Sequence, residues 1–188
     1  MSFLGELMIV TNLERGAIEH YKLWEETYLA EIERLTDRDA RSLHKIRSFS
    51  IKAELDKFPE EQLPAMVVVS PGIVGDTVVK EGDGSYSAQW DLGIAIVSSA
   101  RDEAATDNLR AYYGATIRAV FLQHPQIGEV GSVEEWVDES YNELPVEADR
   151  TVSVVQLLFR VHGEMIVAAA GGTRVPLDDP YEAHEHPE

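Results

Sequence analysis

The sequence predicts an α+β fold in which a mostly antiparallel sheet of four or five strands packs with helices on one face. Three observations indicate this fold class. The chain begins with apolar residues at helical spacing, and a long alternation of apolar and polar residues follows near its middle. A second helical pattern then separates that alternation from another β-branched run. The length of 188 residues fits one domain with a sizeable core.

The first expected element is a helix from Leu13 to Leu35. Thr11 and Glu14 have the spacing of a capping box at its start. Apolar side chains recur at steps of three or four residues and form one stripe with three large aromatic rings: Leu13, Ala17, Tyr21, Trp24, Tyr28, Ile32 and Leu35. The stripe fits the face of a core, and such aromatic anchors also fit a contact between subunits.

A second, short helix is expected over Asp37 to Arg47. Basic side chains at helical spacing would share one of its faces: Arg34, Arg38, Arg41 and Lys45. This basic stripe fits either a solvated surface or a docking surface for an acidic neighbour. Nucleic-acid binding is disfavoured because no aromatic residue lies among these bases. Ser48 to Pro64 is then expected to be a polar connector.

Two strands are expected after the connector. The apolar run Ala65 to Val69 predicts a strand buried on both faces that Pro71-Gly72 ends. Thr77 to Lys80 and the turn Glu81 to Gly84 then predict a hairpin. Its outgoing strand, which runs to Val97, alternates apolar and polar residues at period two.

A long helix should follow, from a capping box at Ser99 and Asp102 to about Gln123. Its expected buried face comprises Ala105, Leu109, Tyr112, Tyr113, Thr116, Ile117, Val120 and Phe121. An acidic strand is expected at Val133 to Tyr141 and a long β-branched strand at Thr151 to Val161. Gly163 then leads into a further apolar run, Met165 to Ala170.

Three regions are therefore expected along the chain. Residues 1–63 form an N-terminal helical region with its connector, residues 64–170 form the α+β core domain, and residues 171–188 form an acidic flexible tail. The net charge of −18 comes from 34 acidic and 16 basic residues, and it is divided unevenly. Residues 1–63 carry −4 and residues 64–188 carry −14, with eight acids and no base from Glu129 to Asp149. Such asymmetry is typical of a solvated face or of a surface with a preferred partner.

Composition excludes several classes of protein. No apolar stretch approaches the ~18–20 residues of a membrane span, and Met1 to Val10 lacks the basic leader and cleavage site of a secretion signal. The absence of cysteine removes disulfide scaffolds, thiol catalysis and thiolate metal sites. The acidity argues against broad binding to phosphate backbones, because such binding requires lysine and arginine.

Motifs of catalysis are hard to find. Gly131-Ser132 lacks the flanking pattern of a nucleophile elbow, and the glycine-bearing stretch Pro71 to Thr77 lacks the lysine and helix of a phosphate loop. His184 and His186, on either side of Glu185, could hold a metal only weakly in a flexible tail. His162, at a strand end, fits a structural side chain better than a general base.

The acidic cluster Glu134, Glu135, Asp138 and Glu139 contains oxygen ligands that suit magnesium. A nuclease-like site would also need basic residues nearby, and the Glu129–Asp149 segment has none. Period two places Glu135 and Glu139 on one face of a strand and Glu134 and Asp138 on the other. Exposure to solvent or to a lumen is therefore favoured. We expect no catalytic, cofactor-binding or metal site, no cofactor and no enzyme activity.

The order of these elements resembles a known family. It comprises the strand Pro64 to Val69, the alternating strand Tyr86 to Val97, the helix Asp102 to Gln123, the passage Glu135 to Tyr141 and the arginine-led strand Asp149 to Val161. Together they resemble the tail terminator, or tail completion, proteins of long-tailed, non-contractile bacteriophages, especially those that infect actinobacteria. The resemblance covers roughly residues 64 to 161, so the long N-terminal helix and the acidic tail lie outside it.

The resemblance implies a structural role in the virion, at the junction of tail and neck, after assembly in the host cytoplasm. Members of this family are α/β sandwiches that form a homohexameric ring. The ring caps the tail tube, ends its polymerisation and joins it to the neck, or head-completion, protein of the capsid. The implied partners are the chain itself, the tail tube protein and the neck protein. DNA would pass through an anionic lumen without specific binding, and the resemblance carries over no catalytic residue.

Two other classes of protein remain open. One is another head–tail connector or adaptor of a phage, which also forms a ring. Tail tubes of uncontrolled length in its absence would identify a terminator rather than a connector. The other is a small enzyme or ligand-binding α+β protein, which requires a concave polar pocket.

A head-to-tail ring needs two complementary surfaces, and the basic stripe and the Glu129–Asp149 segment could form such a pair. Reversal of Arg38 and Arg41 to glutamate should therefore weaken ring formation or docking to the neck. Native mass of the double variant, together with a tail-joining assay, measures both effects. Unchanged oligomer mass and unchanged tail joining would contradict this pairing.

Overall fold

A computed structural model describes residues 10–36, 43–51, 58–81, 86–99, 103–144 and 152–165. The regular elements in chain order are α1 (Val10–Leu35), β1 (Ser48–Ile51), the 3-10 helix η1 (Glu60–Gln62), β2 (Ala65–Ile73), β3 (Val79–Lys80), β4 (Tyr86–Ser99), α2 (Glu103–Gln123), β5 (Gln126–Ile127), β6 (Gly131–Leu144) and β7 (Val152–Met165). Neither described helix is long and apolar enough to cross a membrane.

One mixed sheet organises the fold. Its strand order is β1-β2-β4-β7-β6-β5, and β3 pairs with the beginning of β4. The pair of β1 and β2 is parallel and all other pairs are antiparallel. The α+β class is thus confirmed, whereas the predicted number of four or five strands is too small. The difference comes from three short strands, β1, β3 and β5, of which only β3 overlaps a predicted strand.

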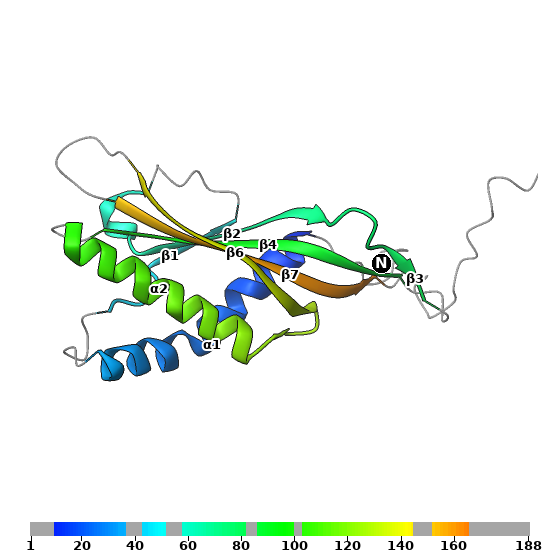
Figure 1. The fold of residues 1–188 in the computed structure, drawn as a ribbon, viewed down its shortest axis with the longest axis horizontal. Coiled ribbons are helices and arrows are strands. Elements are labelled where there is room, and N and C mark those ends of the chain that lie inside the picture. Colours follow the sequence, from blue (N-terminus) through cyan, green and yellow to red (C-terminus); the bar gives the residue numbers. More distant parts are fainter. Residues whose placement is uncertain are drawn as a thin grey trace, which may run out of the picture.

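Both helices lie on one face of the sheet (Figure 1). The side chains that β2, β4 and β7 direct towards them form the main core: Met66, Val68, Trp90, Leu92, Ile94, Ile96, Val155, Leu157, Phe159 and Val161. The helices contribute Leu13, Ala17, Tyr21, Tyr113, Ile117, Val120 and Phe121. Each large side chain buried here is worth about 1.5–3 kcal/mol, so this layer carries much of the fold's stability.

The predicted stripe of α1 is confirmed at its N-terminal end and weakens towards its C-terminal end. Leu13, Ala17 and Tyr21 are fully buried, whereas Leu35 is 66% exposed. The predicted capping box is wrong, because the helix already begins at Val10 and the Glu14 carboxylate binds a backbone group of β2 instead of the helix start. That carboxylate is buried and accepts a hydrogen bond from the Ser70 backbone N–H at 3.0 Å.

The predicted helix Asp37–Arg47 is wrong over Leu43 to Arg47, which are extended and lead into β1; residues 37–42 lie outside the described residues. Two carboxylates of α1 bind this segment. Glu33 accepts from the Leu43 N–H at 2.9 Å, and Glu25 accepts from the Ile46 N–H at 2.6 Å. Backbone groups that a helix would have paired internally are thus satisfied by α1. β1 itself was missed within the predicted polar connector.

Strand β2 continues through Pro71-Gly72, where the sequence predicted its end. A bulge between Val69 and Gly72 accommodates the proline, and Gly72 adopts a φ of 127° that favours glycine. Beyond it Ile73 still pairs with Trp90 of β4. The chain turns at Gly75-Asp76, with Asp76 at a φ of 61°.

The long predicted strands are confirmed as β4, β6 and β7. Gly163 does not separate two segments, since β7 continues through it to Met165. Helix α2 is confirmed to Gln123, and five of its predicted core residues are buried: Tyr113, Thr116, Ile117, Val120 and Phe121. Leu109 and Tyr112 are half-buried. The Ala105 side chain, the hairpin turn at 82–85, residues 166–170 and the predicted tail 171–188 lie outside the described residues.

The close packing around Gly131 predicts a strong effect of one methyl group. A Cβ at Gly131 would meet the His162 carbonyl oxygen at 2.6 Å and Val161 Cγ1 at 2.9 Å. Gly131→Ala should therefore lower the free energy of unfolding by about 1–3 kcal/mol, because β6 and β7 must separate locally. Gly75→Ala, where a Cβ meets nothing within 4 Å, should change it by less than about 0.5 kcal/mol. Equal urea midpoints for the two variants would contradict this packing.

Candidate functional site

The face of the sheet opposite the helices is the most distinctive surface of the described chain. We call it the open face. Strand alternation directs Gly93 and Ala95 of β4, and Gln156 and Leu158 of β7, to this side, because their neighbours Ile94 and Leu157 belong to the helix-side core. Among the described elements no helix covers the middle of the open face. An antiparallel sheet commonly has one face on the core and one face towards solvent, so this side is available to a partner.

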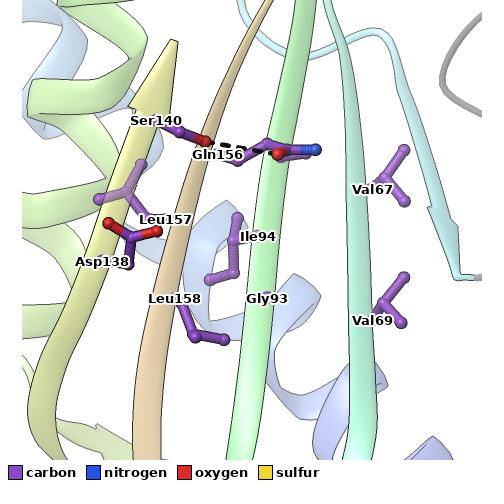
Figure 2. A pocket seen from close by; sticks show the side chains of 10 residues that line it. Val67, Val69, Gly93, Ile94, Asp138, Ser140, Gln156, Leu157 and Leu158 are labelled. Atoms are coloured by element: carbon purple, nitrogen blue, oxygen red, sulfur yellow. Dashed lines mark hydrogen bonds between the residues drawn. The ribbon is translucent and has the colours of Figure 1, made fainter. Parts of the chain in front are cut away.

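A hollow of about 380 Å³ lies in the middle of the open face (Figure 2). Four neighbouring strands line it with mostly apolar groups: Val67, Val69, Gly93, Ile94, Ala95, Asp138, Ser140, Gln156, Leu157 and Leu158. Val69 is 37% exposed there. The glycine at position 93 deepens the hollow, because β4 carries no side chain between Val69 and Leu158.

The side of the hollow formed by β6 is polar. Ser140 Oγ donates a hydrogen bond of 3.5 Å to Gln156 Oε1. Asp138 is exposed, and its carboxylate forms no ion pair within the described residues. The hollow therefore combines an aliphatic floor with one negative charge that no described residue neutralises.

The two ends of the open face differ. At one end Phe58 and Leu63, on either side of η1, pack on a second apolar cluster that includes Val97, Val152 and Val154. At the other end Arg160 of β7 lies between two carboxylates, with Nη1 3.0 Å from Glu135 Oε2 and Nε 3.6 Å from Asp91 Oδ1. The last distance is too long for a hydrogen bond, and both of its atoms are buried without one.

The acids of β6 are less isolated than the sequence suggested. Three of them form ion pairs with arginines of other elements: Glu135 with Arg160, Glu139 with Arg118 and Glu143 with Arg110. A fourth, Glu134, accepts a hydrogen bond from Gln89 at 2.8 Å. The sequence segment around these acids contains no base, but in the folded chain α2 and β7 bring arginines next to them. The expectation that no base lies near the acids is therefore wrong.

The predicted faces of the acidic cluster are only half right. Glu134 and Asp138 both lie on the open face, as period two predicts. Glu135 lies there too, opposite Arg160, whereas Glu139 lies opposite Leu157 on the helix side. Two bulges, between Val133 and Glu135 and between Trp136 and Asp138, shift the alternation. On the helix side Arg118 pairs with Glu139 and lies 5.5 Å from the Trp136 ring centre.

The predicted basic stripe does not appear as one surface. Arg34 is paired with Glu31 and Lys45 with Glu26 at 2.8 Å, both on the exposed side of α1. Lys45 lies in an extended segment rather than in a helix. Arg38 and Arg41 lie outside the described residues, so their pairing with the acidic segment stays a prediction. His184, Glu185 and His186 also lie outside them.

A histidine cluster that the sequence did not indicate joins α1 to the end of α2. The His124 ring stacks on Trp24 with centroids 3.6 Å apart and planes inclined by 5°. Tyr28 Oη donates to Gln123 Oε1 at 2.8 Å, so it accepts from His124 Nε2 at 2.9 Å. His20 is buried beside Phe121, and its Nε2 has no hydrogen-bond partner. The helical spacing of His20 and Trp24 was visible in the sequence, but their partners near residue 124 were not.

Two pKa shifts follow from this burial. Desolvation lowers the pKa of His20, and backbone hydrogen bonds offset part of that effect. Desolvation raises the pKa of Glu25, against the hydrogen bond from Ile46 and the nearby Lys45. His162, the predicted structural histidine, lies half-buried on β7 opposite Gln89 and Ser132. In the described ranges no three histidine, aspartate or glutamate side chains are placed to hold a metal ion.

Comparison of the sequence with models of protein families and with curated proteins finds no match.

The buried His20 predicts a pH dependence of stability. Its pKa is lowered in the folded state, so the unfolded chain takes up the proton first as pH falls below roughly 6.5. Stability is therefore full above that value and is lost as pH falls, by at most about 1.4 kcal/mol for each pH unit. Glu25 acts in the opposite direction, so the comparison must be made between variants.

Urea unfolding at pH 7.5 and 5.5 measures the effect. His20→Gln should show a smaller loss of stability on acidification than the parent protein. His44→Gln, at an exposed histidine, should keep the parent's loss. The same loss in all three proteins would contradict the role of His20.

Proposed function

We propose that the chain is the structural subunit of a homo-oligomeric ring that caps a phage tail tube and joins it to the neck. Two lines of argument support it. The order of the long elements, with β4, α2, β6 and β7 in sequence, is the order on which the resemblance to tail terminators rests. Both helices lie on one side of the sheet and leave an open face for another protein.

The open face is the observation that carries the proposal. Exposed apolar groups with polar borders are typical of interfaces. In the hollow Val69 is exposed and Leu158 is half-buried, whereas Val67 and Ala95 are already buried. Here an aliphatic floor is bordered by Asp138 and by the Asp91–Arg160–Glu135 group. Burial against a neighbouring subunit would cover the apolar groups that remain exposed in the hollow.

The shape of the subunit suits a head-to-tail ring. In such a ring each contact joins two different surfaces, and closure after a fixed number of copies leaves none unpaired. The helix side and the open side of the sheet are chemically unlike, and the sheet edges differ as well. The short parallel strand β1 forms one edge, whereas β5 and the long strand β6 form the other. A two-fold dimer would use one surface twice and would leave others exposed.

The charge suits passage of DNA rather than its capture. A net charge of −18 gives the assembled ring a strongly negative field. Intrachain arginines neutralise Glu135, Glu139 and Glu143, so exposed acids elsewhere, Glu129 among them, would face the lumen or solvent. DNA would traverse such a ring without a phosphate contact that retains it.

A small-ligand binding protein is the second candidate, because the volume of the hollow falls within the range of about 300–1,000 Å³ found for ligand sites. A ligand site of that kind functions in a monomer. The ring proposal requires assembly, so the oligomeric state separates the two candidates.

Native mass spectrometry and negative-stain imaging of the purified full chain test the proposal. We expect a single closed ring, with six copies of the 21.0 kDa chain as the family resemblance implies. Added to polymerising tail tube protein, the ring should limit tube length, whereas a connector would leave tube length uncontrolled. A monomer or a two-fold dimer at every concentration would contradict the proposal.

A further inference from the structure

A second exposed feature, an arm, extends from one end of the sheet. We define the arm as residues 73–81, which comprise the end of β2, the turn at Gly75-Asp76 and β3. Three aliphatic side chains on it are about half exposed: Ile73 at 46%, Val78 at 50% and Val79 at 53%. Figure 1 shows β3 at the end of the sheet beyond the helices. Like the hollow, the arm therefore carries apolar surface that the described chain does not bury.

The arm also carries one basic residue, Lys80, together with two exposed acids, Asp76 and Glu81. Lys80 is exposed and forms no ion pair within the described residues. The hollow has an aliphatic floor, and at its rim lies the Asp138 carboxylate, for which the described part of the chain supplies no ion pair. Both surfaces carry apolar groups, and Lys80 and Asp138 offer one pair of opposite charges between them.

Strand register places the arm's contact side away from the hollow of the same chain. Ile73 lies opposite Trp90 and Lys80 lies opposite Tyr86, and directly paired residues share a face of the sheet. Trp90 belongs to the helix-side core, and Tyr86 shares its side by alternation. The hollow is on the other side, so a chain cannot place its own Ile73 or Lys80 in its own hollow.

We propose that the arm of one copy docks in the hollow of the next copy, with Ile73 on the aliphatic floor and Lys80 beside Asp138. The inference rests on the proposed function, because it names the contact that builds the ring. The arm's contact side and the hollow face in opposite directions. Successive copies therefore have the same orientation, and the arm of each copy covers the hollow of the next. That relation is head-to-tail, and its repetition gives a closed ring or an open filament.

Charge reversal tests the pairing of Lys80 with Asp138. Lys80→Asp and Asp138→Lys should each raise the concentration at half-assembly by up to about tenfold. The double variant, which restores opposite charges, should return close to the parent value. Glu129→Lys, at an exposed acid in the turn before β6, makes the same change of charge and should leave assembly unaltered. Analytical ultracentrifugation of the full-length chain over a concentration series measures all five proteins.

A matched pair of substitutions tests which side of the arm makes contact. Ile73→Asp should raise the concentration at half-assembly by about tenfold to a hundredfold. Val79 lies opposite Ser87, on the other side of the arm, so Val79→Asp should leave assembly near the parent value. Both residues are exposed, and circular dichroism confirms that each variant is folded.

The outcomes separate this inference from the proposed function. A parent protein that stays monomeric overturns both. A parent ring that neither single charge reversal weakens overturns the docking of the arm and leaves the ring intact. Single reversals that weaken the ring without rescue in the double variant overturn the pairing of Lys80 with Asp138. Equal effects of Ile73→Asp and Val79→Asp overturn the assignment of the contact side.

Discussion

The structure depends on one long antiparallel pairing, that of β4 with β7. The two strands match residue for residue from Tyr86 opposite Met165 to Ser99 opposite Val152, without a bulge. This register assigns alternate side chains of both strands to opposite faces, and a shift of one residue would exchange the faces. The helix-side core, with Trp90, Leu92 and Phe159, and the open face, with Gly93 and Leu158, are two consequences of the same pairing. β2 and β6 then extend the sheet on either side and complete the hollow.

The long elements were predictable because the spacing of apolar residues along each one reflects which of its sides is buried. The alternation in β4 as far as Ile94 and the helical stripe of α2 each reflect one buried side, whereas β4 is buried on both faces from Ala95 to Ser98. The errors arose where a distant residue decides the local structure. Leu43 to Arg47 is extended because Glu33 and Glu25 of α1 bind its N–H groups. Glu14 resembles a helix cap but binds Ser70, fifty-six positions further along the chain. The bulges of β6 moved Glu135 to the face opposite that of Glu139, and the local sequence contains no clear signal for them.

The same reasoning applies to the candidate site. The sequence identified the acidic β6 and judged it free of basic neighbours, whereas Arg110, Arg118 and Arg160 reach it from α2 and β7. The negative charge that remains unpaired on the open face is therefore much smaller than the count of acids suggests. Asp138 stands out for this reason, and so does Lys80 on the arm, because neither forms an ion pair within the described residues. Neither the hollow nor the arm's contact side could be predicted, because both depend on strand register across elements distant in sequence.

The central claim is that the open face is buried when the chain assembles. Because the chain has no cysteine, a single cysteine introduced as Val69→Cys in the hollow reports directly on that face. Its rate of reaction with a maleimide should fall sharply when the protein is assembled, relative to the dissociated protein at low concentration. Leu23→Cys, at a residue 71% exposed on α1, should react at the same rate in both states. An equal rate for Val69→Cys before and after assembly would show that the open face stays exposed and would contradict the account.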